Sequence, residues 1–235
     1  MPLADQEQIA ASVKQETHGN VLDSAVEEAR ERVRAGWQDR GYFKVLVSGD
    51  SKILTSGPVS QRIALSVKVE EGLQYTLSAI TFKNNRVLTN VKALRSIFLI
   101  KDGDIFSRAQ IATGLENLRG AYGEYGYINF TVVPNTTFDD DNKTASLELD
   151  VDEGKQFLIS NLNIIGLDVS AQHELLKDSP IRSGQIYNGR LLELFLQKHG
   201  SMFPDCECRD HVQKRLDERR GTVELTFDAR PCSVD

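Results

Sequence analysis

The sequence predicts an α+β fold made of tandem β-α-α-β-β repeats, each with a three-stranded mixed sheet and two helices on one face. Three observations predict it. Glycines follow helix-patterned runs at positions 41, 126 and 200, and Glu-Gly pairs follow strand-patterned runs at 71–72 and 153–154. Between these markers, apolar residues alternate with period two, which is typical of half-buried strands. A string of elements that recurs in this way predicts a repeat protein.

Composition and charge exclude several other classes of protein. The 235 residues are 40% hydrophobic and 26% charged, with a formal net charge of −6. Because phosphate binding needs a basic face, this balance argues against a nucleic-acid partner. No apolar run approaches the roughly 18 residues that predict a membrane-spanning helix. The first residues lack the basic and apolar regions of a signal peptide, so we expect either a cytosolic protein or a fragment excised from a longer one.

The first repeat is expected at residues 1–73, without its opening strand. A helix is predicted from Asp5, and a second begins near residue 23 and ends at Gly41, which is a typical helix stop. Strand-like runs at 42–47 and 62–69 predict a hairpin, with a loop that starts at Gly49 between them. The missing strand favours the interpretation of the chain as a fragment.

The second repeat is expected at residues 74–155 and is complete. A strand is predicted at 75–82, followed by a helix that Thr89 can cap and a second helix that Ser107 can cap. A hairpin of strands at 127–133 and 145–151 follows. This repeat gives the order β-α-α-β-β its clearest form.

The third repeat is expected at residues 156–235, with more divergence. Strand patterns at 157–165 and 222–227 enclose helix patterns at 170–177 and 188–199. Gly200 is expected to stop the second of these helices, and a further strand is predicted to begin at residue 202.

These motifs resemble the polypeptide-transport-associated (POTRA) domain, in which a Gly-Asp turn, a helix, a Tyr-x-x-x-Gly-Tyr ending, a hairpin and a Glu-Gly exit follow one another. The residues that carry the resemblance are Asp102-Gly103-Asp104-Ile105-Phe106, Tyr122-Gly123-Glu124-Tyr125-Gly126-Tyr127 and Glu153-Gly154, with Gly41-Tyr42 and Glu71-Gly72 in the first repeat. The third repeat departs from the pattern, with Gly200-Ser201 and Ala229-Arg230-Pro231 in the corresponding places. We expect the motif residues to shape the module rather than to perform chemistry, since glycine supplies positive φ.

The resemblance implies the periplasmic part of an outer-membrane protein of the BamA type, which assembles or translocates β-barrel proteins. It implies a soluble fragment that is not an enzyme and holds no cofactor. The implied partners are unfolded outer-membrane proteins or secreted β-rich substrates, accessory periplasmic lipoproteins, and a C-terminal membrane barrel of the same protein. The alternative is a rigid periplasmic spacer that holds partners at a set distance without binding substrate.

Candidate metal and disulfide chemistry is confined to a few residues. Cys206, Cys208 and His211 offer zinc ligands, but no second pair of ligands accompanies them, so no metal site is predicted. Cys232 can form a disulfide with Cys206 or with Cys208 in an oxidising compartment, and the sequence leaves this open. The acidic run at 139–142 lacks the glycine and the distal glutamate of a calcium loop and is predicted to be a hairpin turn.

The functional feature that the fold offers is an open sheet edge. In the family, the first strand of each hairpin lies at an edge, where its backbone can pair with an extended peptide while tolerating many side chains. By this resemblance, the candidate partner-binding residues are Tyr42, Phe43, Val45, Val47, Tyr127, Ile128, Phe130, Val132, Phe203 and Cys206.

Overall fold

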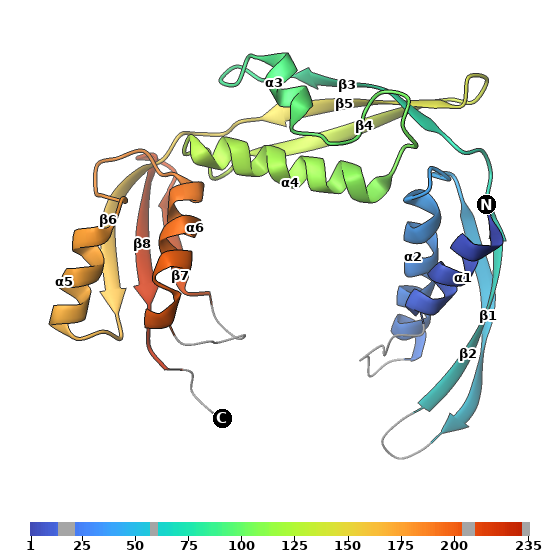
Figure 1. Cartoon of the computed structure of the whole chain (residues 1–235), viewed down its shortest axis with the longest axis horizontal. Coiled ribbons are helices and arrows are strands. Elements are labelled where there is room, and N and C mark those ends of the chain that lie inside the picture. The colour runs from blue at the N-terminus through green and yellow to red at the C-terminus, as the bar shows by residue number, and fades with distance from the viewer. Residues whose placement is uncertain (14–21, 57–60, 204–209, 232–235) are drawn as a thin grey trace. The chain divides into compact units, whose positions relative to one another are not determined.

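The structure, a computed structural model, describes residues 1–13, 22–56, 61–203 and 210–231 (Figure 1). The chain divides into two compact units. The first unit consists of Met1–Thr81, Arg95–Gly114 and Pro134–Leu149, and the second of Phe82–Leu94, Leu115–Val133 and Asp150–Asp235. Strands and helices combine in the predicted α+β fold, and its three-stranded sheets confirm the fold class. The boundaries of the three repeats stay predictions.

The N-terminal elements are two helices and a hairpin. They are α1 (Leu3–Val13), α2 (Leu22–Gln38), β1 (Leu46–Ser56) and β2 (Gln61–Glu70). The strands pair antiparallel, with Leu46 opposite Glu70. Val33 and Trp37 of α2 form a small core with Ile9 of α1 and with Val45, so the apolar face of the second helix is the buried one.

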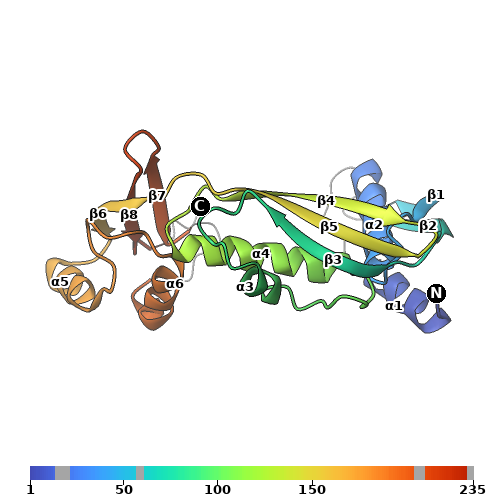
Figure 2. The same ribbon diagram turned by 90° about the horizontal axis from the view of Figure 1, so that it is seen from above.

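The central elements form a sheet with two helices. They are β3 (Thr76–Lys83), α3 (Val91–Ser96), α4 (Arg108–Glu124), β4 (Thr131–Asp139) and β5 (Thr144–Asp152). The strand order is β3-β5-β4, so β4 lies at an edge. Along β5, Ala145, Leu147, Leu149 and Val151 are buried and the residues between them are not, which leaves one face of the sheet uncovered. Figure 2 shows α3 and α4 together on one side of this sheet.

The C-terminal elements repeat the arrangement. They are β6 (Leu158–Ile165), α5 (Val169–Asp178), α6 (Gly189–Lys198), a 3-10 turn at Gly200–Met202, β7 (Val212–Asp217) and β8 (Thr222–Asp228). β6 pairs with β8 in parallel and β7 pairs with β8 antiparallel, so the sheet is mixed and β7 lies at its edge. The core contains Phe157, Leu192, Phe195, Phe203 and Phe227.

Two predicted strands begin later in the chain than the sequence suggested. β4 starts at Thr131 rather than at 127, and β1 starts at Leu46 rather than at 42. In the first case Phe130 N donates to Tyr127 O (3.2 Å), and Phe130 stacks on Tyr122 with ring centroids 4.2 Å apart. The residues after the helix are therefore held in a turn against that helix, because burial of their side chains outweighs their β propensity.

Other boundaries also differ from the prediction. β1 passes through Gly49, which lies opposite Val67, so no loop begins there. Asn90 caps α3 instead of Thr89, since its Oδ1 accepts from Ala93 N at 3.1 Å. The strand predicted from 202 is absent at Met202, which ends the 3-10 turn, and the edge strand of that sheet is β7. Phe203 N donates to Gly200 O at 3.1 Å and its side chain enters the core, which explains the turn.

Candidate functional site

The open edge of β7 is the first candidate site. Asp228 N donates to His211 O at 2.9 Å, and Val212 lies opposite Phe227 in the register of β7 and β8. Because hydrogen-bonded and non-bonded pairs alternate in an antiparallel ladder, the backbone groups of Val212, Lys214 and Leu216 point away from β8. Among the described residues, no strand pairs with β7 on that side. In the described part of the chain, this edge is therefore open.

A groove runs beside the same edge. Its volume is about 540 Å³, and its lining includes Tyr187, Leu192 and Leu196 on one side and Val212 to Lys214 on the other. Lys214 Nζ lies 5.4 Å from the centroid of the Tyr187 ring. An extended chain paired with β7 would place alternate side chains next to this lining.

The edge of β4 offers a second candidate. A groove of about 560 Å³ lies at the start of the strand, lined by Asn84, Arg86, Thr131, Val133 and residues 150–154. Val133 is 59% exposed. Pro134 follows it and has no N–H to donate, so the ladder that a peptide can form along β4 is interrupted there. The edge of β7 has no such interruption.

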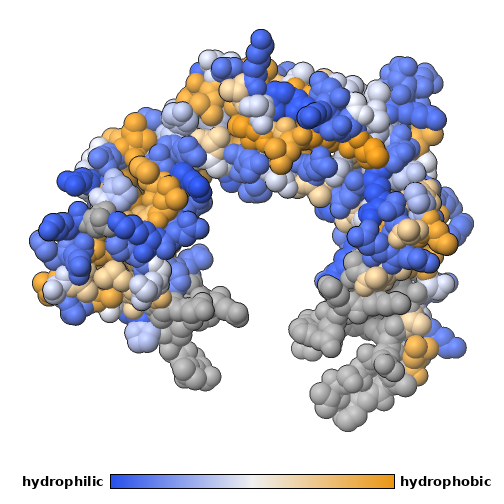
Figure 3. Space-filling model, in the orientation of Figure 1, coloured by the Kyte–Doolittle hydropathy of each residue, from blue (hydrophilic) through white to orange (hydrophobic). Residues whose placement is uncertain are grey.

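The visible surface of the molecule is mixed in character. On the face drawn in Figure 3, hydrophilic residues cover most of the visible surface and apolar residues lie between them. Recognition through backbone pairing suits such a surface, because it requires only small apolar contacts.

Neither a membrane-spanning helix nor a cluster of three metal-binding side chains occurs among the described residues. Cys206, Cys208 and Cys232 lie outside that part of the chain.

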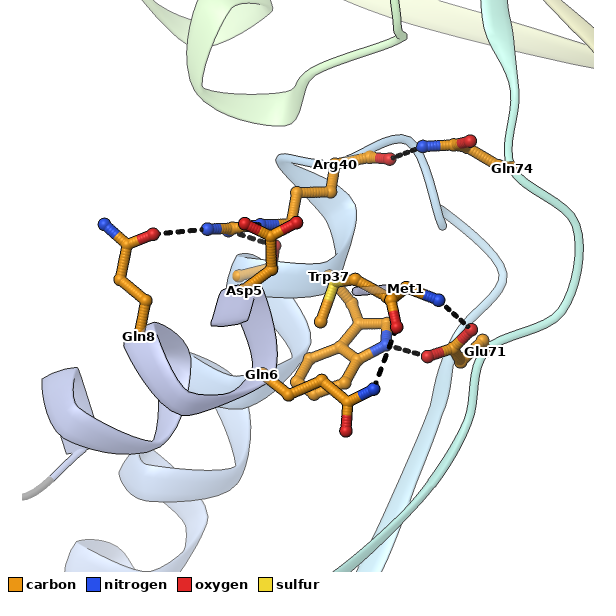
Figure 4. Close-up of polar contacts among 9 residues, drawn as sticks. Met1, Asp5, Gln6, Gln8, Trp37, Arg40, Glu71 and Gln74 are labelled. Carbon is orange, nitrogen blue, oxygen red and sulfur yellow. Dashed lines mark hydrogen bonds and ion pairs between the residues drawn. The ribbon is translucent and has the colours of Figure 1, made fainter. Parts of the chain in front are cut away.

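The glutamate of each Glu-Gly exit has a local role that the sequence pattern did not reveal. Glu71 accepts from Trp37 Nε1 (3.3 Å) and also contacts the amino group of Met1 (2.9 Å), as Figure 4 shows. Glu153 accepts from the Tyr122 hydroxyl (3.0 Å). Each carboxylate therefore satisfies the polar group of the aromatic residue near the end of the preceding long helix.

The C-terminal elements carry a usable signal that was missed. Trp37 and Tyr122 stand four residues before Gly41 and Gly126, and the residue four before Gly200 is Leu196, which has no polar group. Ala229-Arg230-Pro231 stands there in place of the Glu-Gly pair. The carboxylate is thus present where this helix residue carries a donor and absent where it does not. The pKa of the Tyr122 hydroxyl is raised, mainly because the hydroxyl is buried and secondly because it donates to the carboxylate of Glu153.

Replacing Glu153 with leucine is expected to destabilise the protein by about 1–3 kcal/mol, because the Tyr122 hydroxyl and Val87 N would lose their acceptor. Urea unfolding measures the loss. The same change in a Tyr122→Phe background should cost less, since one of the two donors is already gone. Equal costs in the two backgrounds would show that the hydrogen bond contributes nothing.

The turn at Gly41 and Tyr42 contacts the residue just before β3. Gly41 O accepts from Tyr75 N (2.9 Å), Tyr75 O accepts from Phe106 N (2.9 Å), and the Gln74 side chain donates to Arg40 O (2.8 Å). Gly41 has a φ of +86°, and a Cβ there would lie 2.8 Å from Tyr75 O. The glycine is thus required by its neighbour as well as by its own conformation.

The next turn repeats these contacts one by one. Gly126 O accepts from Phe157 N (2.9 Å), Phe157 O accepts from Tyr187 N (2.9 Å), and the Gln156 side chain donates to Tyr125 O (2.9 Å). The φ of Gly126 is +84°. The same backbone contacts therefore join a helix-ending turn to the residue just before the following strand twice within the chain.

Side chains reinforce the two contacts differently. At the first, Phe43 lies 5.1 Å from Phe106 and 5.6 Å from Phe138 between ring centroids, and Lys44 Nζ contacts Asp140 Oδ1 at 2.6 Å. The Tyr75 hydroxyl donates to the same carboxylate (2.7 Å). At the second, Ile128 packs against the C-terminal core, and Asn129 donates to Glu218 (2.9 Å). Among the described residues, an ion pair thus reinforces the first of these two contacts and not the second.

The first contact is expected to weaken in acid. Hydrogen bonds from Lys44, then from Tyr75, hold the pKa of Asp140 below its usual range. A group whose folded-state pKa is lowered contributes stability above its unfolded pKa, about 3.9, and loses it as pH falls through the folded value. NMR signals of Lys44 and Phe43 should therefore shift at pH below about 4.

The Asp140→Asn variant is expected to abolish that pH-dependent change, because it removes the titrating group. Lys44→Gln should reduce the change, since the ammonium is the largest cause of the shift. An unaltered acid response in Asp140→Asn would assign the transition to another group.

The predicted partner-binding residues lie in different places. Two of these residues lie within strands, Val47 in β1 and Val132 in β4. Six others precede those strands: Tyr42, Phe43, Val45, Tyr127, Ile128 and Phe130. Val45, Phe130 and Phe203 are buried within the chain, so their side chains are not available to a partner. Cys206 lies outside the described residues. Sequence reasoning missed β7, whose alternation of apolar and polar residues is short and weak.

Comparisons with known proteins agree with the geometry. Residues 75–154 match the model of the POTRA family, described as a surface antigen variable number repeat. The outer membrane protein assembly factor BamA of Buchnera aphidicola subsp. Acyrthosiphon pisum (strain APS) is 22% identical over 172 residues, which are 72% of this chain and 27% of that protein. The chain spans about a quarter of the length of the curated relatives that it matches.

Solved structures share the fold. The crystal structure of Haemophilus influenzae BamA POTRA3-5 is similar with a TM-score of 0.71 and 22% identity, over 95% of this chain and 90% of that chain. BamA from Haemophilus ducreyi lacking POTRA domains 1-3 gives a TM-score of 0.54 and 16% identity, over 66% and 29%. Residues 75–154 therefore match the POTRA family, and the chain has the fold of consecutive POTRA domains.

Proposed function

We propose that this chain is the periplasmic POTRA region of an outer-membrane β-barrel assembly or translocation protein, and that it binds extended polypeptide segments at the edge of β7. The observation that carries the proposal is the outer edge of β7, which pairs with no strand among the described residues and lies beside a groove of about 540 Å³. The edge supplies main-chain hydrogen bonds and the groove accepts side chains, which are the two parts of β-augmentation.

This mode of binding suits substrates with many different sequences. Backbone groups are the same in every polypeptide, so an edge that pairs with them discriminates little between side chains. The proposed ligands are unfolded outer-membrane proteins or secreted β-rich substrates. Accessory periplasmic lipoproteins and the membrane barrel of the same protein are further proposed partners. Three repeats at 1–73, 74–155 and 156–235 are the proposed organisation.

The test is a titration followed by NMR. A synthetic peptide of alternating valine and threonine, about eight residues long, is added to the isotope-labelled chain. Amides of Val212, Lys214 and Leu216 are expected to shift. Lys214→Pro should abolish the shifts, because it removes an N–H that points to the open edge, while Lys214→Ala keeps that N–H and should retain binding. Unchanged amides along β7 at millimolar peptide would contradict the proposal.

A rigid spacer is the second candidate function. The two sets of matching contacts, from Gly41 to Tyr75 and from Gly126 to Phe157, favour it because they fix each turn to the residue that leads into the next strand. A spacer would keep its activity in the parent protein when Lys214→Pro is introduced and lose it when Gly126 is replaced. A binding edge would show the opposite sensitivity at Lys214.

A further inference from the structure

A second groove continues the one beside β7. It has a volume of about 330 Å³, and its lining includes Gly120 and Gly123 of α4, Tyr127, and Lys214 of β7. Tyr187, Gly189, Glu193 and Lys214 line both grooves. A ligand that occupies the groove beside β7 therefore lies next to the opening of the second.

The glycines of this groove have no structural requirement within the chain. A Cβ at Gly120 or Gly123 would meet nothing within 4 Å, and neither glycine has a positive φ. Glycine within a helix lowers helix stability relative to alanine. Gly114 in the same helix differs, since a Cβ there would lie 2.1 Å from the Phe98 ring. The open helix backbone at Gly120 and Gly123 is thus a space that the protein itself does not fill.

Four of the six charged side chains around this space form ion pairs, and the six together have no net charge. Arg119 contacts Glu116 at 2.6 Å, and Arg190 contacts Glu193 at 3.4 Å. The Lys214 ammonium lies over the Tyr187 ring. The groove therefore favours an uncharged side chain, and the missing Cβ atoms leave room for a bulky one that contacts the helix backbone and the neighbouring tyrosine.

We infer that the ligand of the β7 edge is an extended segment with a bulky apolar side chain near one end, which lies over Gly120 and Gly123. This inference rests on the proposed function of the edge. It makes the binding site composite, since β7 and α6 supply one part and α4 supplies the other. The length of the segment and the position of its bulky residue then distinguish one ligand from another. Backbone pairing alone does not discriminate in this way.

The experiment compares peptides that differ at one position. In one series of valine-threonine peptides, a single leucine replaces each residue in turn. In the matched series, alanine replaces the same residue. The intact chain is expected to bind one leucine peptide about tenfold more tightly than its alanine counterpart, because a leucine side chain is buried. Affinity that is independent of the position of the leucine would overturn the inference.

Variants of the groove provide the second measurement. Gly120→Leu together with Gly123→Leu is expected to fold, since both positions are open, and to remove the advantage of leucine over alanine. Ala112→Leu, an exposed position on the same helix outside the groove, is the matched control and should keep it. If the glycine variants keep the leucine preference while Lys214→Pro still abolishes binding, the composite groove is wrong and the β7 edge stands. If Lys214→Pro leaves both peptides bound, the proposed function itself fails.

Discussion

Gly126→Ala is expected to destabilise the protein by about 2–5 kcal/mol, through two costs that add. An L-residue at a φ of +84° costs about 1–2 kcal/mol. The new Cβ would also lie 2.8 Å from Ile186 Cγ2 and 3.1 Å from Phe157 O, and overpacking of this kind costs about 1–3 kcal/mol. Guanidinium unfolding, followed by NMR signals of Phe157 and Tyr187, measures the effect.

Gly184→Ala is the matched control for this prediction. Its φ is also +84°, but a Cβ there would meet nothing within 4 Å. Only the conformational cost of about 1–2 kcal/mol should remain. The difference between the two variants therefore measures how tightly the Gly126 turn packs against Ile186 and Phe157. If both variants lose equal stability, that contact contributes nothing and the case for a rigid spacer weakens.

Gly114→Ala and Gly120→Ala are expected to change stability in opposite directions, although both lie in α4. Alanine gains about 1 kcal/mol over glycine in a helix. At Gly120 this gain should appear in full, because the position is open. At Gly114 the Cβ would lie 2.1 Å from Phe98 Cδ1, and Phe98 is buried, so a net loss of about 1–3 kcal/mol is expected.

Thermal unfolding of the two single variants and of the double variant tests this pair. The effects should add, because the two glycines have no common contact. Stabilisation by Gly114→Ala would show that Phe98 moves without cost and that the packing of α4 on it is loose.

The fold was largely predictable because its signals are local and repeated. The helix face of Val26, Val33 and Trp37, the capping Ser107 and the alternation along β5 all arise from residues close together in sequence. Strand starts were less predictable. Tyr42 and Tyr127 have high β propensity, yet the residues after each glycine form a turn, because their burial against the preceding helix depends on tertiary packing.

The candidate site was harder to predict than the fold. The resemblance directed attention to hairpin edges, and β4 does lie at an edge, but the chosen side chains of Phe130 and Phe203 are buried. The groove beside β7 joins Tyr187 to Val212, which are distant in the sequence, so no local pattern reveals it. The carboxylate partners of Trp37 and Tyr122 are likewise distant, although the joint absence of donor and carboxylate in the third repeat was a usable signal.

The sequence by itself determined the order of elements and the positions at which the chain must turn. Gly41 and Gly126 illustrate this, because a positive φ after a helix is a local requirement that glycine meets at low cost. Only the tertiary structure decided that the same glycines accept hydrogen bonds from Tyr75 and Phe157, which directly precede the following strands. It also decided which edge strand lies beside a groove. Contacts of this kind depend on residues far apart in the chain, whose approach is set by packing and not by local preference.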